Sequence, residues 1–270
     1  MVDNDRSVIE VAFSEARGPR FAGGDAPTHT PVDPSGERGL EGRLAVVTGA
    51  AGLLGAAITA ELTARGAHVC VIGRDMDALR ATVDGLGPGA HTAMLRCDLA
   101  SIEDVESAAD FIERIGEPVD LLVHAAGMYS PTTIARGTVE ELDEHYLLDV
   151  RGPYLLTQRL LPSLTDAVGR VVFFSVGGAE GGPDADVHRH ISQAGLVAFA
   201  SGLREEAAPY GIRVLTVRTD DVEDVPGDPG SQAFLEACAA RMLDLLAAGA
   251  VDVTDLHLRR GGRRTRSERR

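Results

Sequence analysis

Three closely spaced glycines are the residues whose type and spacing most directly predict chemistry. Gly49, Gly52 and Gly55 follow an apolar run at residues 44–48. The first glycine permits a tight turn, the second lets the backbone approach a pyrophosphate, and the third allows a helix to pack closely on a sheet. Because the amide groups at the start of that helix face the phosphates, the loop predicts a dinucleotide site. The predicted contacts of this loop are Gly49, Ala51, Gly52, Leu53, Leu54 and Gly55.

An arginine at the end of the next apolar run bears on the choice of cofactor. Residues 68–72 are followed by Gly73 and Arg74. A carboxylate at this place would accept a hydrogen bond from a ribose 2′-hydroxyl, whereas Arg74 offers a planar fork of donors to a 2′-phosphate. The sequence therefore favours NADP over NAD. The alternative is a surface arginine that pairs with Asp75 or Asp77.

Short apolar runs alternate with amphipathic segments along the chain. The expected strands are residues 44–48, 68–72, 91–95, 119–125, 170–175, 212–217 and 256–259. The expected helices are residues 53–65, 75–84, 101–115, 138–162, 191–209 and 231–248. Such alternation is typical of a parallel sheet with helices on both faces. We therefore expect an α/β fold, a single doubly wound domain with a seven-stranded parallel sheet (the Rossmann fold).

The two ends of the chain differ from its middle. Residues 1–40 are rich in Gly and Pro and predict a mostly irregular extension, in which only residues 8–13 could form a short strand or docking arm. Residues 41–258 form the expected nucleotide-binding domain. Residues 259–270 carry seven Arg and one Glu, and we interpret this tail as a solvated end.

Composition excludes several classes of function. The 270 residues carry a net charge of −15, which argues against nucleic acid as a partner. The basic residues are all Arg, so chemistry that needs a lysine is excluded. Cys70, Cys97 and Cys238 fit no metal-ligand spacing, and we expect no metal.

No signal peptide is visible, and no apolar run approaches the roughly 18 residues of a membrane span. We expect a cytoplasmic protein with no membrane partner.

Several segments after the glycine loop follow a familiar order. They are Cys97–Leu99, the turn His124–Gly127 and the strand Gly169–Ser175. In this order they resemble the short-chain dehydrogenase/reductase family, from about residue 40 to residue 262. The resemblance implies an NADP(H)-dependent reductase, a small-molecule ketone as substrate, and a homo-oligomer. It also implies an oxyanion hydrogen bond from Ser175 and further cofactor contacts at Asp98, Leu99, Ala125, Ala126 and Gly127.

The catalytic residues depart from the family's pattern of Asn, Ser, Tyr and Lys. Aligning residues 192–196 with the family motif places Gln193 at the Lys position and Arg189 at the Tyr position. A shift of one residue places Ser192 and His188 there instead. The Asn position falls on Asp149, and only Ser175 matches. The family's usual mechanism is therefore not carried over.

The source of the proton stays open at this point. The residues that could donate it are Tyr129, Tyr146, Tyr154, His188, Arg189 and His190. A second route needs no protein acid, because a carbonyl that is hydrogen-bonded to a neighbouring phenol carries its own proton source. In this loss of Tyr and Lys the chain resembles atypical ketoreductases that act on aromatic polyketides in antibiotic biosynthesis. Two alternatives are a non-catalytic dinucleotide-binding regulator or scaffold and a non-redox cyclase or dehydratase.

The resemblance also places the family's substrate lid at residues 220–233.

Overall fold

A single sheet organises the part of the chain that the computed structural model describes, which comprises residues 11–13, 39–128, 130, 132–177, 186–220, 229–247 and 254–258. Its order is β1-β4-β3-β2-β5-β6-β7-β8. The strands are β1 (Val11–Phe13), β2 (Leu44–Thr48), β3 (His68–Gly73), β4 (His91–Arg96), β5 (Val119–His124), β6 (Arg170–Gly177), β7 (Arg213–Asp220) and β8 (Asp255–Leu258). The seven expected parallel strands are confirmed. β1 adds an eighth, antiparallel strand at the edge beside β4.

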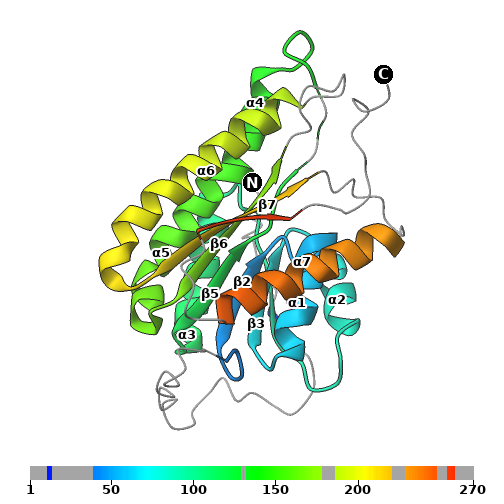
Figure 1. Cartoon of the computed structure of the whole chain (residues 1–270). Coiled ribbons are helices and arrows are strands. Elements are labelled where there is room, and N and C mark those ends of the chain that lie inside the picture. Colours follow the sequence, from blue (N-terminus) through cyan, green and yellow to red (C-terminus); the bar gives the residue numbers. More distant parts are fainter. Residues whose placement is uncertain are drawn as a thin grey trace, which may run out of the picture.

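Helices cover both faces of this sheet. They are α1 (Leu53–Ala64), α2 (Met76–Asp84), α3 (Ile102–Ile115), α4 (Val139–Tyr146), the π-helical turn η1 (Leu147–Arg151), α5 (Gly152–Ala167), α6 (Val187–Ala207), the short 3₁₀ turn η2 (Ala208–Tyr210) and α7 (Pro229–Ala247). Figure 1 shows α3, α5 and α6 on one face and α1, α2 and α7 on the other. The expected doubly wound architecture is therefore confirmed.

The continuous apolar runs of the strands are explained by burial on both faces. Along β2, Leu44 and Val46 belong to one hydrophobic core, while Ala45 and Val47 belong to a second core. Side chains alternate between the two faces of a strand, so a strand covered on both faces must be apolar at every position. The first core includes Leu156 and Leu160 of α5, and the second includes Ile58 and Leu62 of α1.

Several helix boundaries differ from the sequence prediction. α6 begins at Val187, four residues before the expected start, because the carboxylate of Asp186 accepts a hydrogen bond from the amide of Arg189 and caps the helix. The helix expected over residues 138–162 is divided into α4 and α5 by the π-helical turn η1. α7 begins at Pro229, so residues 229–233 of the expected lid are helical.

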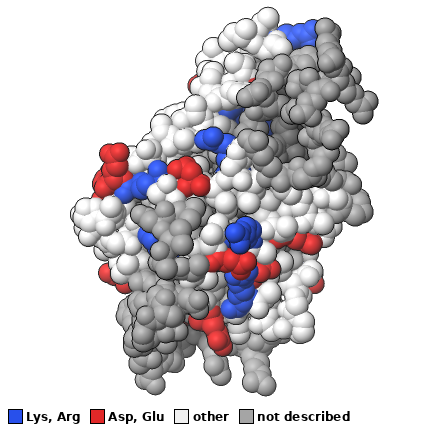
Figure 2. Space-filling view, viewed as in Figure 1, with Lys and Arg blue, Asp and Glu red and all other residues white. Residues whose placement is uncertain are grey.

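Several sequence predictions lie outside the described residues. These are most of residues 1–40, Tyr129, residues 221–228 of the expected lid and the tail at residues 259–270. Within the described segments, no helix is long and apolar enough to cross a membrane. The same segments contain no group of three or more His, Cys, Asp or Glu side chains that could hold a metal ion. On the face in Figure 2, acidic and basic side chains are interspersed.

Candidate functional site

A cleft of about 380 Å³ lies where the order of the parallel strands reverses. β2 and β5 are neighbours there, and the chain leaves β2 toward β3 on one side and returns to β5 on the other. Ligands of such sheets bind outside the carboxyl ends of the strands at this reversal. The lining residues are Gly49, Ala51, Gly52, Leu53, Leu54, Gly55, Ile72, Gly73, Arg74, Asp75, Cys97, Leu99, Ala125, Ala126, Gly127, Met128, Leu148, Arg189 and Thr219.

The glycine loop shows why side chains are excluded from its positions. Gly49 has a φ of 67°, and a Cβ atom on it would lie 2.5 Å from the Cα of Ala126. A Cβ on Gly55 would lie 2.2 Å from the carbonyl oxygen of Gly49. Gly52 is the N-cap residue of α1, and the first turn of that helix carries no acidic residue. Backbone amides at this end of α1 therefore face the cleft without a competing carboxylate.

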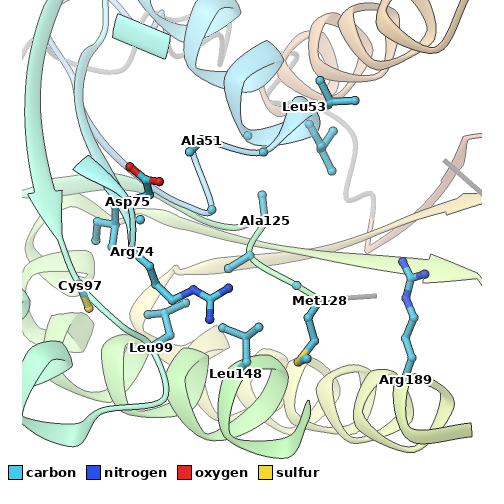
Figure 3. A pocket seen from close by; sticks show the side chains of 18 of the residues that line it. Ala51, Leu53, Arg74, Asp75, Cys97, Leu99, Ala125, Met128, Leu148 and Arg189 are labelled. Atoms are coloured by element: carbon cyan, nitrogen blue, oxygen red, sulfur yellow. The ribbon is translucent and has the colours of Figure 1, made fainter. Parts of the chain in front are cut away.

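Arg74 and Asp75 leave the end of β3 in different directions. The carboxylate of Asp75 caps α2 by accepting hydrogen bonds from the amides of Asp77, at 2.9 Å, and Ala78, at 3.0 Å. Asp77 is paired with Arg80 at 3.2 Å. Figure 3 shows the guanidinium of Arg74 directed into the cleft and away from Asp75. Neither carboxylate that the sequence offered as a partner for Arg74 is thus used for that purpose.

The predicted site residues fall into two groups in the structure. All the predicted cofactor contacts line the cleft except Asp98, whose carboxylate accepts a hydrogen bond from the amide of Ala100 at 3.0 Å. Ser175 is buried near the end of β6 and is not one of the lining residues. Met128 and Leu148 form an apolar wall of the cleft that the sequence does not predict. A signal for Met128 was present, because it directly follows the predicted turn.

The candidates for a proton donor are separated by the start of α6. Arg189 lines the cleft, whereas the ring of His188 is buried so close to Gly137 that a Cβ there would lie 2.5 Å from it. His190 is exposed. Tyr146 and Tyr154 are about half exposed and do not line the cleft. Of the candidates that the structure describes, only Arg189 reaches the cleft.

A buried polar cluster supports the wall of the cleft behind Arg189. The hydroxyl of Ser192 donates to the carboxylate of Asp149 at 2.5 Å, and the amide of Gln193 donates to the same oxygen at 3.4 Å. The fully buried ring of His145 lies between two carboxylates, with Nδ1 3.7 Å from Asp149 and Nε2 3.8 Å from Asp186. This cluster joins α4, the π-helical turn and the start of α6.

The charge of His145 follows from its neighbours. The carboxylates of Asp149 and Asp186 raise the pKa of His145 above its ordinary value, against the opposing effects of burial and of the positive charge on Arg189. The ring of His188, whose centre is 6.0 Å away, also faces His145. A raised pKa in the folded state means that protonated His145 stabilises the fold below about pH 6.5 and that this stabilisation is lost as pH rises through the folded-state pKa.

We expect the substitution His145→Gln to reduce stability in a pH-dependent manner. At about pH 6 it leaves two buried carboxylates without their cation, and the expected loss is about 3 kcal/mol. The loss should be smaller at about pH 9, because the wild-type imidazole gives up its proton as pH rises through the folded-state pKa. Urea unfolding at both pH values measures this difference, with the exposed His91→Gln as control. An equal loss at the two pH values would show that His145 carries no charge.

Burial holds two other groups in their neutral forms at neutral pH. Burial lowers the pKa of His124 to about 3, while its Nε2 lies 2.8 Å from the hydroxyl of Thr157 and its ring stacks on Phe173. Burial raises the pKa of Cys97 to about 12, so this cleft residue is a thiol rather than a reactive thiolate. His124 is thus a structural residue beside the cleft.

Comparison with known proteins places this geometry in a family. A family model described as short chain dehydrogenase matches residues 43–225. The D-threitol dehydrogenase of Mycolicibacterium smegmatis is 28% identical over 181 residues, which cover 66% of this chain and 69% of that protein.

Solved structures agree with the family match. A metagenomic short-chain oxidoreductase in complex with NADP has a TM-score of 0.69 and 26% identity, over 82% of this chain and 99% of that one. A variant of the actinorhodin polyketide ketoreductase with NADPH also has a TM-score of 0.69 and 26% identity, over 80% of this chain and 95% of that one. Since the family model covers more than half of the sequence, the chain belongs to the short-chain dehydrogenase family of oxidoreductases.

Proposed function

We propose that this protein is an NADPH-dependent ketoreductase. The observation that carries the proposal is the cleft at the strand reversal, which has a glycine cradle in its middle and an arginine at either end. Two relatives of known structure were solved with NADP or NADPH, and they share this fold. The family match supports hydride transfer as the type of reaction.

The residues of the cleft fit a dinucleotide phosphate. Gly49, Gly52 and Gly55 leave the space that a pyrophosphate needs next to the start of α1. Arg74 extends into the cleft, where its planar fork suits a 2′-phosphate. Asp75 does not oppose this contact, because its carboxylate is used to cap α2. Ala125, Ala126 and Gly127 would hold the nucleotide from the β5 side.

The other end of the cleft suits the reacting carbonyl. When bound, NADPH supplies a hydride to the carbonyl carbon and is oxidised to NADP⁺. Met128 and Leu148 form an apolar wall that excludes water, and Arg189 adds a positive charge beside it. Ser175 stays a predicted oxyanion contact, near the end of β6. Asp98 likewise stays a predicted contact to the adenosine.

The proposed substrate is a quinone-type carbonyl of an aromatic polyketide in antibiotic biosynthesis. The family's Tyr and Lys are missing, and the chain contains no Lys at any position. A substrate whose carbonyl is hydrogen-bonded to its own phenol needs no protein acid to deliver a proton. The actinorhodin polyketide ketoreductase among the structural relatives supports this class. We infer a reaction like that of the angucyclinone ketoreductase of simocyclinone-type biosynthesis.

Calorimetry with NADPH and an anaerobic assay with hydroxylated anthraquinones test the proposal together. We expect saturable binding of NADPH and oxidation of NADPH that depends on the quinone. A protein that binds no NADPH would refute the proposal. Binding of NADPH with no turnover of any quinone would instead favour the regulator or scaffold, and conversion of the quinone without NADPH oxidation would favour a non-redox cyclase or dehydratase.

A further inference from the structure

Three charged side chains line the cleft, and they differ in what they do there. Asp75 is used as the cap of α2, and Arg74 lies at the β3 end, where the proposed 2′-phosphate would bind. Arg189 enters from α6 at the opposite end, with Met128 and Leu148 between the two arginines (Figure 3).

The backbone of Arg189 is fixed on both sides. Its amide donates to the carboxylate of Asp186 at 3.0 Å, and its carbonyl oxygen accepts from the hydroxyl of Ser192 at 3.2 Å. Ser192 is in turn bonded to Asp149 at the π-helical turn. These contacts determine which face of α6 turns toward the cleft, so Arg189 faces it while His188 is buried beside Gly137.

The start of a helix is an electrostatically unfavourable place for a cation such as Arg189. Arg189 lies in the first turn of α6, where the helix dipole is positive and disfavours a cation. The buried carboxylates of Asp149 and Asp186 lie on either side of His145, and the carboxylate of Asp186 also accepts a hydrogen bond from the amide of Arg189. The result is a guanidinium held at the wall of an otherwise apolar end of the cleft.

We propose that Arg189 is a catalytic residue that binds the carbonyl oxygen of the substrate and stabilises the negative charge that develops on it. This inference rests on the proposed function. During reduction the carbonyl carbon gains a hydride, and the π electron pair of the C=O bond moves onto oxygen. NADPH is the reductant, NADP⁺ is the oxidised product, and one proton completes the alcohol. A fixed donor aimed at such an oxyanion lowers the barrier of the reaction.

The chemistry of arginine also specifies the class of substrate. A guanidinium keeps its protons at every accessible pH, so Arg189 stabilises the oxyanion without releasing a proton to it. The proton must then come from solvent or from a hydroxyl group of the substrate itself. This requirement selects ketones that carry an acidic hydroxyl next to the carbonyl, and it disfavours simple ketones with no such group.

Two variants test the role of Arg189, and a third serves as a matched control. Arg189→Met removes the charge, Arg189→Lys keeps it, and Arg159→Met makes the same change on α5, outside the cleft, where Arg159 is paired with Asp110. Each is assayed anaerobically with NADPH and 1-hydroxyanthraquinone, and with anthraquinone as the substrate that lacks the hydroxyl. We expect kcat to fall by about 100-fold in Arg189→Met, by less in Arg189→Lys, and not at all in Arg159→Met.

A binding measurement gives a readout that does not depend on turnover. The phenolate of 2-hydroxyanthraquinone absorbs at longer wavelength than the phenol, so its spectrum reports its ionisation when it is bound to the NADP⁺ complex. We expect Arg189→Met to weaken binding of the phenolate by about tenfold, with Arg189→Lys between it and the wild type.

The outcomes separate this inference from the proposed function. If the wild type binds no NADPH in the calorimeter, the proposed function fails. If NADPH binds equally to all variants and Arg189→Met keeps kcat and phenolate affinity within about threefold of the wild type, only the role of Arg189 is overturned. If the wild type binds NADPH but reduces neither quinone, the proposed function fails and the catalytic role of Arg189 fails with it.

Discussion

Replacing Gly55 with alanine is expected to damage both the fold and the binding of the cofactor. The new Cβ would lie 2.2 Å from the carbonyl oxygen of Gly49 and 2.8 Å from the Cα of Ala50. Both contacts are to backbone, so no flexible side chain can move away. α1 must therefore shift from β2, which disrupts the core between them and displaces the amides that would face the phosphates. We expect a loss of about 3 kcal/mol.

Substitutions of two further glycines separate the effect on cofactor binding from the effect on stability. Gly52→Ala places a Cβ 3.3 Å from the oxygen of Gly49, a tight contact that the fold can absorb, but the methyl group enters the path of a pyrophosphate. This substitution should raise the Kd for NADPH about tenfold and leave the melting temperature nearly unchanged. Gly202→Ala lies in α6, where nothing is within 4 Å of the new Cβ, and it should not weaken binding.

Thermal melting and NADPH calorimetry on the three variants distinguish the outcomes. For a chain of this size, 3 kcal/mol corresponds to a decrease of about 10 °C in melting temperature for Gly55→Ala. Gly202→Ala should melt at or slightly above the wild-type temperature, because alanine is the better residue within a helix. Unchanged stability and unchanged NADPH affinity in Gly55→Ala would contradict the close approach of α1 to the loop.

The sheet could be predicted because its signal is local. Each strand that is covered on both faces must be apolar throughout, and each such run is visible in the sequence without knowledge of its neighbours. The edge strand β1 was only one of two options for residues 8–13, since a short apolar segment does not specify its partner. Its pairing with Leu95 and Ala93 of β4 is a tertiary contact.

The helix boundaries show where local signals fail. Asp186 caps α6 from outside any apolar period, so periodicity alone places the start of that helix too late. The π-helical turn at Leu147–Arg151 places Asp149 where it accepts a hydrogen bond from Ser192, 43 residues further along the chain. A contact over such a separation leaves no signal in the spacing of residues 138–162.

The candidate site divides in the same way. The place of the glycine loop and of Arg74 at the cleft could be predicted, because both directly follow the ends of apolar strands. The cluster of His145, Asp149 and Asp186 could be predicted only in part: His145 and Asp149 are four residues apart in one helical stretch, but Asp186 joins them only after α4 and α6 have packed together. The choice between His188 and Arg189 also depended on the start of α6, which fixes the face that each of them occupies.

Removing the charge of Arg74 is expected to change the preference for the cofactor more than any other surface substitution. If Arg74 forms charge-assisted hydrogen bonds with a 2′-phosphate, Arg74→Ala loses about 2.7 kcal/mol, and the Kd for NADPH rises about 100-fold. NADH has no phosphate at this place, so its Kd should change by less than about threefold. Calorimetry with both nucleotides measures the two constants.

A second arginine on the same side of the sheet is the control for Arg74. Arg80 is also exposed, but it is paired with Asp77 on α2 and does not line the cleft, so Arg80→Ala should leave both nucleotides unaffected. The dependence on salt concentration gives an independent check. Added salt should weaken the binding of NADPH more than the binding of NADH in the wild type, and it should weaken both to the same extent in Arg74→Ala. If Arg74→Ala weakens the two nucleotides to the same extent, Arg74 contacts a part that they share, and the preference for NADPH must come from another residue.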